Sequence, residues 1–323
     1  MSLLTAVSLA ICIQAHGLDR PKGDPLSQTL RPLFEKEGGS PQDVGDSLAA
    51  VFTKYYSKPT TAAEATDAGY SAVDGKCDPY LGVAYTQGGK LSKKTPEFIY
   101  FTPGGQLAGV AVDVYGTPET SLIDAGYFVK KDEQRYHISA TFRAPDKVCS
   151  SSADEMVVGD RVVLNAAGPE GPGVNYHISL NETGAISQGF SRGSCFDGMG
   201  WHYFKDISGE STSQKMKFPL PAEHLLPIVP MYHEGKLNAI FFTTTKVQQT
   251  LLPPRTNGWE PIPLPNKLMC GNWCDTDCGF SGTAIWSTQH WYFHDHTKVI
   301  CPSSLHCTLK GITCCEASKS LEL

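Results

Sequence analysis

The sequence has little charge and no excess of basic residues. Charged residues make up 19% of its 323 positions, and 27 Lys and Arg stand against 33 Asp and Glu, which gives a formal net charge of -6 at pH 7. Proteins that bind nucleic acids or anionic membrane surfaces need clustered cations to neutralise phosphates. The composition therefore predicts no nucleic-acid partner.

Long apolar runs are also missing. A membrane-spanning helix needs about 20 apolar residues, whereas the N-terminal run extends only from Leu3 to Ile13, and no basic segment precedes it. Its length and position are typical of a signal peptide removed near Ala15 and His16, although a buried N-terminal helix is the alternative. We expect residues 1–15 to be a signal, the mature protein to be secreted and extracellular, and no transmembrane segment to be present.

The cysteines do not show the paired C-x2-C spacing of zinc knuckles. Of the 11 cysteines, Cys12 lies in the expected signal, which leaves an even ten. An even number in a secreted chain favours disulfides, here five. Seven of the ten lie within the last 54 positions, so at least one bridge must reach back to the rest of the chain. The ten are Cys77, Cys149, Cys195, Cys270, Cys274, Cys278, Cys301, Cys307, Cys314 and Cys315.

One glycosylation sequon is present, at Asn181-Glu182-Thr183. It lies in a stretch flanked by glycine, which is typical of a surface loop. In the secretory pathway Asn181 would therefore carry a glycan.

Short runs of β-branched and aromatic residues, separated by Gly, Pro and Asp, dominate the chain after Cys77. Such runs favour strands. Before Cys77 the apolar residues repeat with a helical period after Pro41. We therefore expect a mainly β fold with a helical N-terminal arm over residues 16–76. The expected strands cover 98–101, 110–115, 136–142 and 157–164, and the apolar stripe of the expected helix is Val44, Leu48, Val51, Phe52 and Tyr55.

Two pairs of similar segments indicate an internal repeat. The segment 105–110 resembles 235–240, and 201–206 resembles 290–295, in the same order along the chain. Repeated order at similar spacing is typical of duplication. We expect two pseudo-symmetric β units packed as one disulfide-stabilised unit. The first covers 77–220, with 116–188 inserted, and the second covers 221–323 with the Cys-rich C-terminus.

A G-x-S-x-G motif places Ser191 between Gly189 and Gly193. In hydrolases this serine is a nucleophile when it follows a buried strand and precedes a helix. Neither neighbour is expected here, because polar residues and glycine precede the motif and a glycine-rich stretch follows it. The context predicts that Ser191 is not a nucleophile.

Three histidines, His290, His294 and His296, follow a period of two together with Tyr292. On a strand they would share one face, where three imidazoles could bind zinc, copper or non-haem iron. The alternative is a half-exposed strand whose polar face is rich in histidine. His202, His233 and His294 are the residues expected to act as general acids or bases.

Aromatic residues near these histidines could line a pocket for a planar or apolar ligand. The candidates are Trp201, Tyr203, Trp291 and Tyr292. The alternative is that they belong to the β core.

Three classes of function stay open. The first is a secreted enzyme that acts on a small or apolar molecule through the His-rich site, and the second is an extracellular small-molecule binding protein with an aromatic-lined pocket. The third is a structural or matrix protein. In gross layout, as a secreted, cysteine-rich chain of this length, the sequence is similar to the luciferases of luminous marine worms. That resemblance implies an oxygen-dependent oxidoreductase, which we favour over a serine hydrolase; the cofactor is open, a divalent metal included, and so is the oligomeric state.

Overall fold

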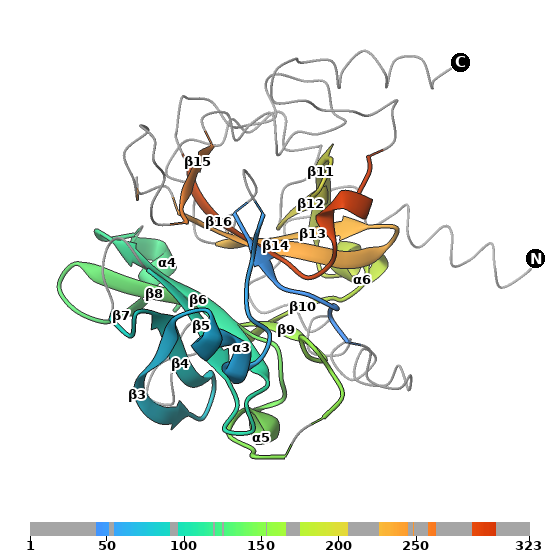
Figure 1. Cartoon of the computed structure of the whole chain (residues 1–323). Helices are drawn as coiled ribbons and strands as arrows, with labels where there is room; N and C mark the ends of the chain where they lie inside the picture. Colours follow the sequence, from blue (N-terminus) through green and yellow to red (C-terminus); the bar gives the residue numbers. More distant parts are fainter. Residues whose placement is uncertain are drawn as a thin grey trace, which may run out of the picture. The chain divides into compact units, whose positions relative to one another are not determined.

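A computed structural model describes residues 43–51, 55–90, 96–118, 120–124, 126–152, 154–165, 175–205, 226–244, 248, 258–262 and 286–301. The chain divides into two units, 1–42 and 43–323, and every described residue belongs to the second. This unit is mainly β, as expected, and consists of two antiparallel sheets (Figure 1). The expected signal peptide and the first part of the expected helical arm lie outside the described residues.

The first sheet, called sheet I here, has the strand order β10-β9-β8-β6-β5-β4-β3, with β7 beside β8. It contains the four strand segments predicted from the sequence, although β9 begins later than expected. Its strands are β3 (Tyr70–Asp78), β4 (Gly82–Gln87), β5 (Glu97–Phe101), β6 (Leu107–Tyr115), β7 (Val129–Lys130), β8 (Arg135–Thr141), β9 (Val162–Asn165) and β10 (Asn175–Ile178).

The second sheet, sheet II, has the order β11-β12-β13-β14-β16-β1-β2, with β15 beside β16. It contains strands from both expected units, since β11 and β12 precede residue 220 and β13 to β16 follow it. Its strands are β1 (Ala49–Ala50), β2 (Tyr56–Ser57), β11 (Phe190–Phe196), β12 (Gly200–Lys205), β13 (Ile228–His233), β14 (Lys236–Thr244), β15 (Glu260–Ile262) and β16 (Trp286–Tyr292).

The helices among the described residues are short: α3 (Ala62–Asp67), α4 (Thr120–Asp124), α5 (Pro145–Val148), α6 (Glu182–Ser187) and the 3-10 turn η2 (His296–Lys298). Thr61 caps α3 in a capping box with Glu64, and Asn181 caps α6 by accepting a hydrogen bond from the amide of Gly184. Side-chain oxygens at these positions satisfy amides that have no partner within the helix.

In the described part of the chain, no helix combines the length and apolar character needed to cross a membrane.

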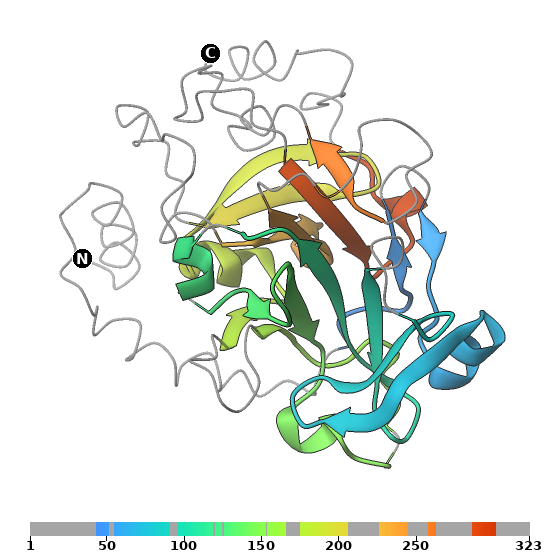
Figure 2. The same ribbon diagram turned by 90° about the vertical axis from the view of Figure 1, so that its left-hand side faces the viewer.

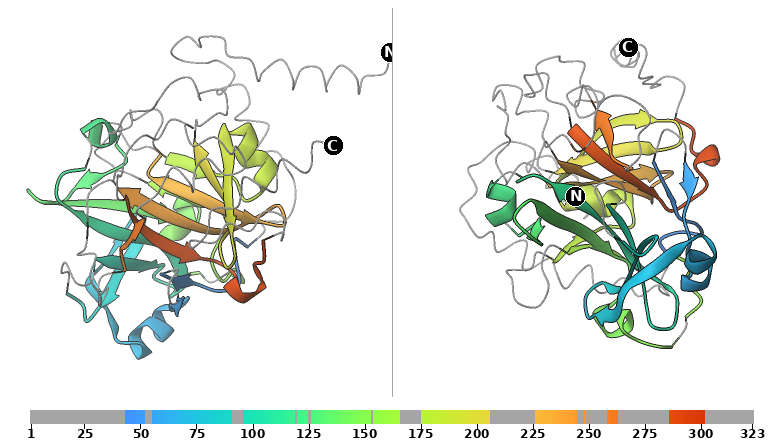
Figure 3. Two further views of the ribbon diagram at one scale, coloured as in Figure 1. Left: turned by 90° about the horizontal axis from the view of Figure 1, so that it is seen from above. Right: turned by 60° about the vertical axis from the view of Figure 1, so that its left-hand side comes forward.

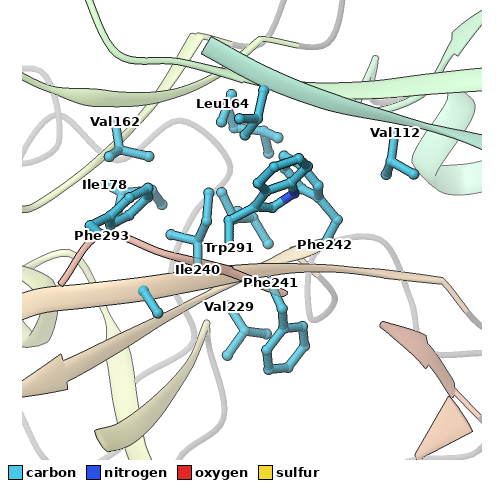
Figure 4. Packing of buried hydrophobic residues seen from close by; sticks show 14 of the residues in the cluster. Val112, Val162, Leu164, Ile178, Val229, Ile240, Phe241, Phe242, Trp291 and Phe293 are labelled. Atoms are coloured by element: carbon cyan, nitrogen blue, oxygen red, sulfur yellow. The ribbon is translucent and has the colours of Figure 1, made fainter. Parts of the chain in front are cut away.

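The hydrophobic core lies between the sheets, which form two layers (Figures 2 and 3). Figure 4 shows Trp291 and Phe242 of sheet II pointing toward Leu164 of sheet I. The rings of Phe142 and Phe293 meet edge to face, with centroids 5.4 Å apart. Alternate residues of each strand therefore fill the core, and the residues between them point to the outer faces of the sheets.

The helix predicted over residues 44–55 is wrong for the residues described there. Ala49 and Ala50 form strand β1, which pairs with the edge of β16. The amides of Asp46 and Ser47 both donate to the carbonyl oxygen of Phe293. Pairing with β16 provides hydrogen-bond partners for the backbone of this segment and buries Leu48 and Ala50. Tertiary contacts therefore override the local helical period.

Two disulfides lie within the described residues, Cys77–Cys149 and Cys195–Cys301. The other six cysteines of the expected ten lie outside them. Cys77 and Cys195 stand in β3 and β11, the first strands of two runs that each continue through five more strands, β4 to β8 and β12 to β16. Each bridge therefore fastens the beginning of one run to the segment after its last strand.

We predict that the mature protein contains five disulfides. Its intact mass should rise by ten hydrogens on reduction, two for each bridge among the ten cysteines. Mass spectrometry of the purified protein before and after reduction checks this. A gain of eight hydrogens or fewer would reveal free thiols.

The two sheets match in several details. Bridges connect Thr61 with Gln106 and Asn181 with Lys236, each between a helix cap and the hairpin three strands later. Bulges interrupt β3 before Cys77 and β11 before Cys195. The segments 105–110 and 235–240, similar in sequence, both contain the turn of a hairpin, β5–β6 and β13–β14. The other similar pair does not match, since 201–205 belongs to β12 and 290–292 to β16 of one sheet.

Candidate functional site

The outer face of sheet II brings several of the predicted residues together. His290 on β16 stands opposite Phe241 on β14. Figure 4 shows Phe241 and Val229 on the side of the sheet away from Trp291. Because neighbouring residues of a strand alternate between faces, His290 shares the outer face with Phe241, whereas Trp291 lies in the core.

A carboxylate holds His290 in place. Glu260 Oε2 lies 3.0 Å from His290 Nδ1, and both side chains are 1% exposed. Strand β15 runs beside β16 and pairs Glu260 with Thr288, which brings the carboxylate to the imidazole. A carboxylate accepts the Nδ1 proton and thereby assigns the tautomer in which the basic lone pair of the neutral ring is on Nε2.

Aromatic rings continue from His290 in both directions. Toward β12 the centroid of Phe241 lies 4.8 Å from His290 and 5.9 Å from His202. Toward β1 the rings of His290 and Tyr292 are parallel, with centroids 6.0 Å apart. We call the set formed by Phe196, His202, Phe241, His290, Tyr292, Tyr55 and His296 the aromatic row.

The aromatic row is buried in the middle and half-exposed at its ends. His202, Phe241, His290 and Tyr292 are buried, whereas Tyr55 is half-buried. The Tyr55 ring stacks on His296 with centroids 3.6 Å apart. Burial raises the pKa of both tyrosine phenols, so each remains protonated at neutral pH.

The expected common strand face of the three histidines is wrong. Strand β16 ends at Tyr292, and His296 begins the η2 turn. His294 lies between them, 37% exposed, with its Nδ1 3.5 Å from Asp46. The strand does not continue to His294 and His296, because the carbonyl of Phe293 accepts from the amides of Asp46 and Ser47 and Asp295 then caps the η2 turn.

No group of three or more His, Cys, Asp or Glu side chains that could hold a metal ion occurs among the residues the structure describes. The two imidazoles that do share a face, His202 and His290, stand on opposite sides of Phe241.

The other predicted residues lie apart from the aromatic row. Trp201 is half-buried, with the guanidinium of Arg192 4.5 Å above its ring. Tyr203 is buried, donates to Glu182 and meets Tyr232 edge to face. His233 ends β13 and is half-buried. Trp291 is a core residue, as the alternative interpretation of these aromatics held.

Ser191 lies in β11, which follows helix α6 and leads into β12. A nucleophile elbow needs the reverse order, a strand that leads into a helix. The surroundings are therefore those expected from the sequence for a serine that is not a nucleophile.

Sequence reasoning missed Glu260, Phe241 and Tyr55. Glu260 is 30 residues from His290, and no periodic pattern connects the two. Phe241 lies in an apolar run whose alternation could have shown that it shares a face with Ala239. Tyr55 was assigned to a helix, and this concealed its place beside Tyr292 and His296.

A second buried polar cluster lies on the outer face of sheet I. Asp113 Oδ1 lies 2.9 Å from His137 Nδ1, and His137 Nε2 lies 3.1 Å from the hydroxyl of Tyr100. Arg135 Nη1 lies 3.3 Å from the other carboxylate oxygen. The three residues on β5, β6 and β8 come together because antiparallel neighbours place Asp113 opposite His137. None of these residues was predicted as a site.

The stability of the protein is expected to depend on His137. Burial lowers the pKa of this imidazole from the ordinary value of 6.5, despite its hydrogen bond to Asp113. The unfolded chain therefore binds the proton more readily, so stability is full above pH 6.5 and falls as the pH drops toward the lower pKa of the folded state. The slope should approach about 1.4 kcal/mol per pH unit.

Denaturant unfolding of the wild type and of His137→Gln between about pH 7.5 and pH 5 checks this. Subtracting the slope of the variant isolates the contribution of His137 from the other titrating groups. Equal slopes would contradict the prediction.

Comparisons of the chain with known protein families, with curated proteins and with solved structures found no match.

Proposed function

We propose that this protein is a secreted enzyme that acts on a small apolar molecule at the aromatic row of sheet II. The observation that carries the proposal is the buried pair of His290 and Glu260, 3.0 Å apart at the centre of a row of rings. A buried imidazole oriented by a carboxylate is the arrangement of a general base.

In this proposal each part of the row has a role. Glu260 holds Nδ1 of His290, so Nε2 removes a proton from the substrate and Glu260 stabilises the imidazolium that forms. The rings of Phe241 and Tyr292 bind a planar substrate by stacking and by edge contacts. His202, on the far side of Phe241, is the second acid or base. His294, which is exposed and pairs with Asp46, takes no part.

Secretion is supported by the disulfides. The bridges Cys77–Cys149 and Cys195–Cys301 close loops with sequence separations of 72 and 106 residues. Structural disulfides persist in oxidising compartments such as the extracellular space. In that setting the sequon at Asn181 would carry its glycan through the amide nitrogen, while the amide oxygen caps α6.

We also propose that the two sheets descend from one duplicated unit, now residues 43–149 and 157–301. Matching disulfides, bulges and cap bridges support this. So does a shared V-G-D sequence, Val44–Asp46 and Val158–Asp160, since the amides after each glycine donate to the carbonyl of Phe293 and Phe142 respectively.

In this duplication each unit begins with a hairpin, β1 and β2 in the first and β9 and β10 in the second, and the two hairpins have exchanged sheets. Strands β9 and β10 precede α6, the first helix of the second unit, yet join sheet I beside β8. Strands β1 and β2 precede α3, yet join sheet II beside β16. The exchange places Tyr55, from the first unit, beside Tyr292 of the second, so the aromatic row needs both units.

A neutral planar dye tests the binding part of the proposal. Nile red is expected to bind the purified protein at one saturable site, with a rise in fluorescence. His290→Gln should weaken this binding about tenfold, because it removes one ring from the centre of the row. His294→Gln is the matched control and should bind as the wild type does. Absence of a saturable site, or equal effects of both variants, would contradict the proposal.

Turnover separates an enzyme from a binding protein, the second candidate, which the aromatic row alone would also support. A panel of small phenols and heteroaromatic compounds is added to the protein, with heat release and oxygen uptake as readouts. We expect turnover that Glu260→Gln abolishes while circular dichroism is unchanged. Saturable dye binding with no turnover across the panel would leave the binding protein as the better description.

A further inference from the structure

The hydrogen bonds around Tyr100 fix the direction in which a proton can move. Asp113 accepts from His137 Nδ1, so the Nε2 atom of His137 must be the acceptor of its bond with Tyr100. The phenol therefore donates to an imidazole lone pair at 3.1 Å. Burial keeps the pKa of His137 low, so this lone pair is present at neutral pH.

We infer that Tyr100 is a redox-active tyrosine whose proton passes to His137 when the phenol loses an electron. This inference concerns sheet I and does not depend on the aromatic row of sheet II. A one-electron oxidant takes an electron from the phenol and is itself reduced by one electron. The O–H bond breaks, a bond forms between the proton and Nε2, and the products are a neutral phenoxyl radical and an imidazolium paired with Asp113.

The surroundings favour this reaction. Tyr100, His137 and Asp113 are at most 5% exposed, so water cannot replace the imidazole as the proton acceptor. Burial and the nearby carboxylate of Asp113 raise the pKa of Tyr100, so the phenol does not ionise before it is oxidised. The ring of Phe98 lies 4.9 Å from His137 and shields the pair. The burial of Tyr100 does not prevent its oxidation, because an electron can leave the phenol without an open channel to solvent.

Two other buried phenols, Tyr232 and Tyr203, have different acceptors. Tyr232 donates to the backbone carbonyl of Ser179 at 2.7 Å, and a carbonyl oxygen is too weak a base to keep the proton. Tyr203 donates to the carboxylate of Glu182, which is partly exposed. Among these three, only Tyr100 has a buried imidazole backed by a carboxylate, so Tyr232 and Tyr203 provide matched controls.

Trp259 connects this cluster with sheet II. Its indole Nε1 donates to the backbone oxygen of Asp113 at 3.2 Å, and the next residue, Glu260, binds His290. An oxidisable indole thus lies between the two histidine–carboxylate pairs. A transfer of oxidising equivalents along this route would rest on the proposed function, whereas the chemistry of Tyr100 itself does not.

The test oxidises the full-length protein with hexachloroiridate(IV) and freezes it for electron paramagnetic resonance. The wild type should give a tyrosyl signal, and Tyr100→Phe, which removes only the hydroxyl, should lose it. Tyr232→Phe and Tyr203→Phe should keep it. In His137→Gln the amide can accept the hydrogen bond but cannot take the proton, so the signal should also be lost. Melting curves confirm that each variant is folded.

Two results would overturn the inference. The first is an unchanged signal in Tyr100→Phe, and the second is an unchanged signal in His137→Gln. If His137→Gln does not fold, the rate of oxidation in heavy water decides instead. Transfer of the proton with the electron requires the wild-type rate to fall in heavy water, and an equal rate in both solvents would contradict it. None of these measurements involves the aromatic row. A negative result for Tyr100 can therefore be distinguished from a negative result for the proposed enzyme activity.

Discussion

Replacing Gly159 by alanine is expected to lower the free energy of unfolding by about 3 to 5 kcal/mol. A methyl group there would lie 2.1 Å from the carbonyl oxygen of Phe142, and the backbone has φ +146. That carbonyl already accepts from the amides of Asp160 and Arg161. The turn cannot shift aside, because the carboxylate of Asp43 binds the amide of Gly159 at 2.9 Å.

Denaturant unfolding with linear extrapolation measures the effect. Gly116→Ala is the matched control, since that residue also has a positive φ, +89, but nothing lies within 4 Å of the added methyl group. It should cost only about 1 kcal/mol, the usual penalty of the backbone conformation. Similar losses in both variants would show that the contact with Phe142 does not matter.

The proposed duplication extends this prediction to Gly45, which precedes the hairpin of β1 and β2. A methyl group on Gly45 would lie 2.1 Å from the carbonyl oxygen of Phe293, the same approach that Gly159 makes to Phe142. Gly45→Ala should therefore also destabilise the protein strongly. If the hairpins β1–β2 and β9–β10 each stabilise one sheet, Gly45→Ala and Gly159→Ala should both expose the aromatic residues of the core at a lower denaturant concentration than the wild type does.

The strands of sheet I were predictable because their signal is local. Runs such as 98–101 and 136–142 contain β-branched and aromatic residues that fit a pleated, buried surface. The segments 105–110 and 235–240, which resemble each other in sequence, likewise each contain the turn of a hairpin. These features depend only on residues that are close together in the sequence.

The sequence predictions that were wrong concern residues whose structure depends on partners far away in the chain. The apolar stripe from Val44 to Tyr55 has a helical period, yet its backbone pairs with β16, about 240 residues later. The histidines were expected on one strand, but β16 ends at Tyr292 and Asp295 caps a turn that contains His296. His290 was found, whereas Glu260 was not, because only the position of β15 beside β16 brings them together. The cluster of Tyr100, Asp113 and His137 likewise requires three strands in register.

Arg143 is another feature that no sequence pattern indicates, and its replacement should have a large effect. The side chain is 2% exposed. Its Nε donates to the carbonyl of Leu107 at 2.5 Å, and its Nη2 donates to the carbonyl of Met156 at 2.9 Å. Its Nη1 pairs with Asp154 at 2.5 Å. One planar guanidinium thus joins β6 to residues 154–156, which precede the hairpin of β9 and β10.

Arg143→Met should lower the free energy of unfolding by about 3 to 5 kcal/mol, because it fills a similar volume but removes the donor to Oδ2 of Asp154 and to two backbone carbonyls. Arg143→Lys keeps the charge, yet one ammonium cannot reach all three acceptors, so it should fall between the wild type and Arg143→Met. Asp154→Asn provides the second edge of a double-mutant cycle: in its background the loss caused by Arg143→Met should shrink, since no charge is left unpaired. Denaturant unfolding of the four proteins measures the cycle. If Arg143→Lys is as stable as the wild type, a positive charge alone is sufficient and the three hydrogen bonds of the guanidinium are not needed. If Arg143→Met costs the same stability with Asp154 as with Asn at position 154, the stabilisation comes from the two carbonyls and not from the ion pair.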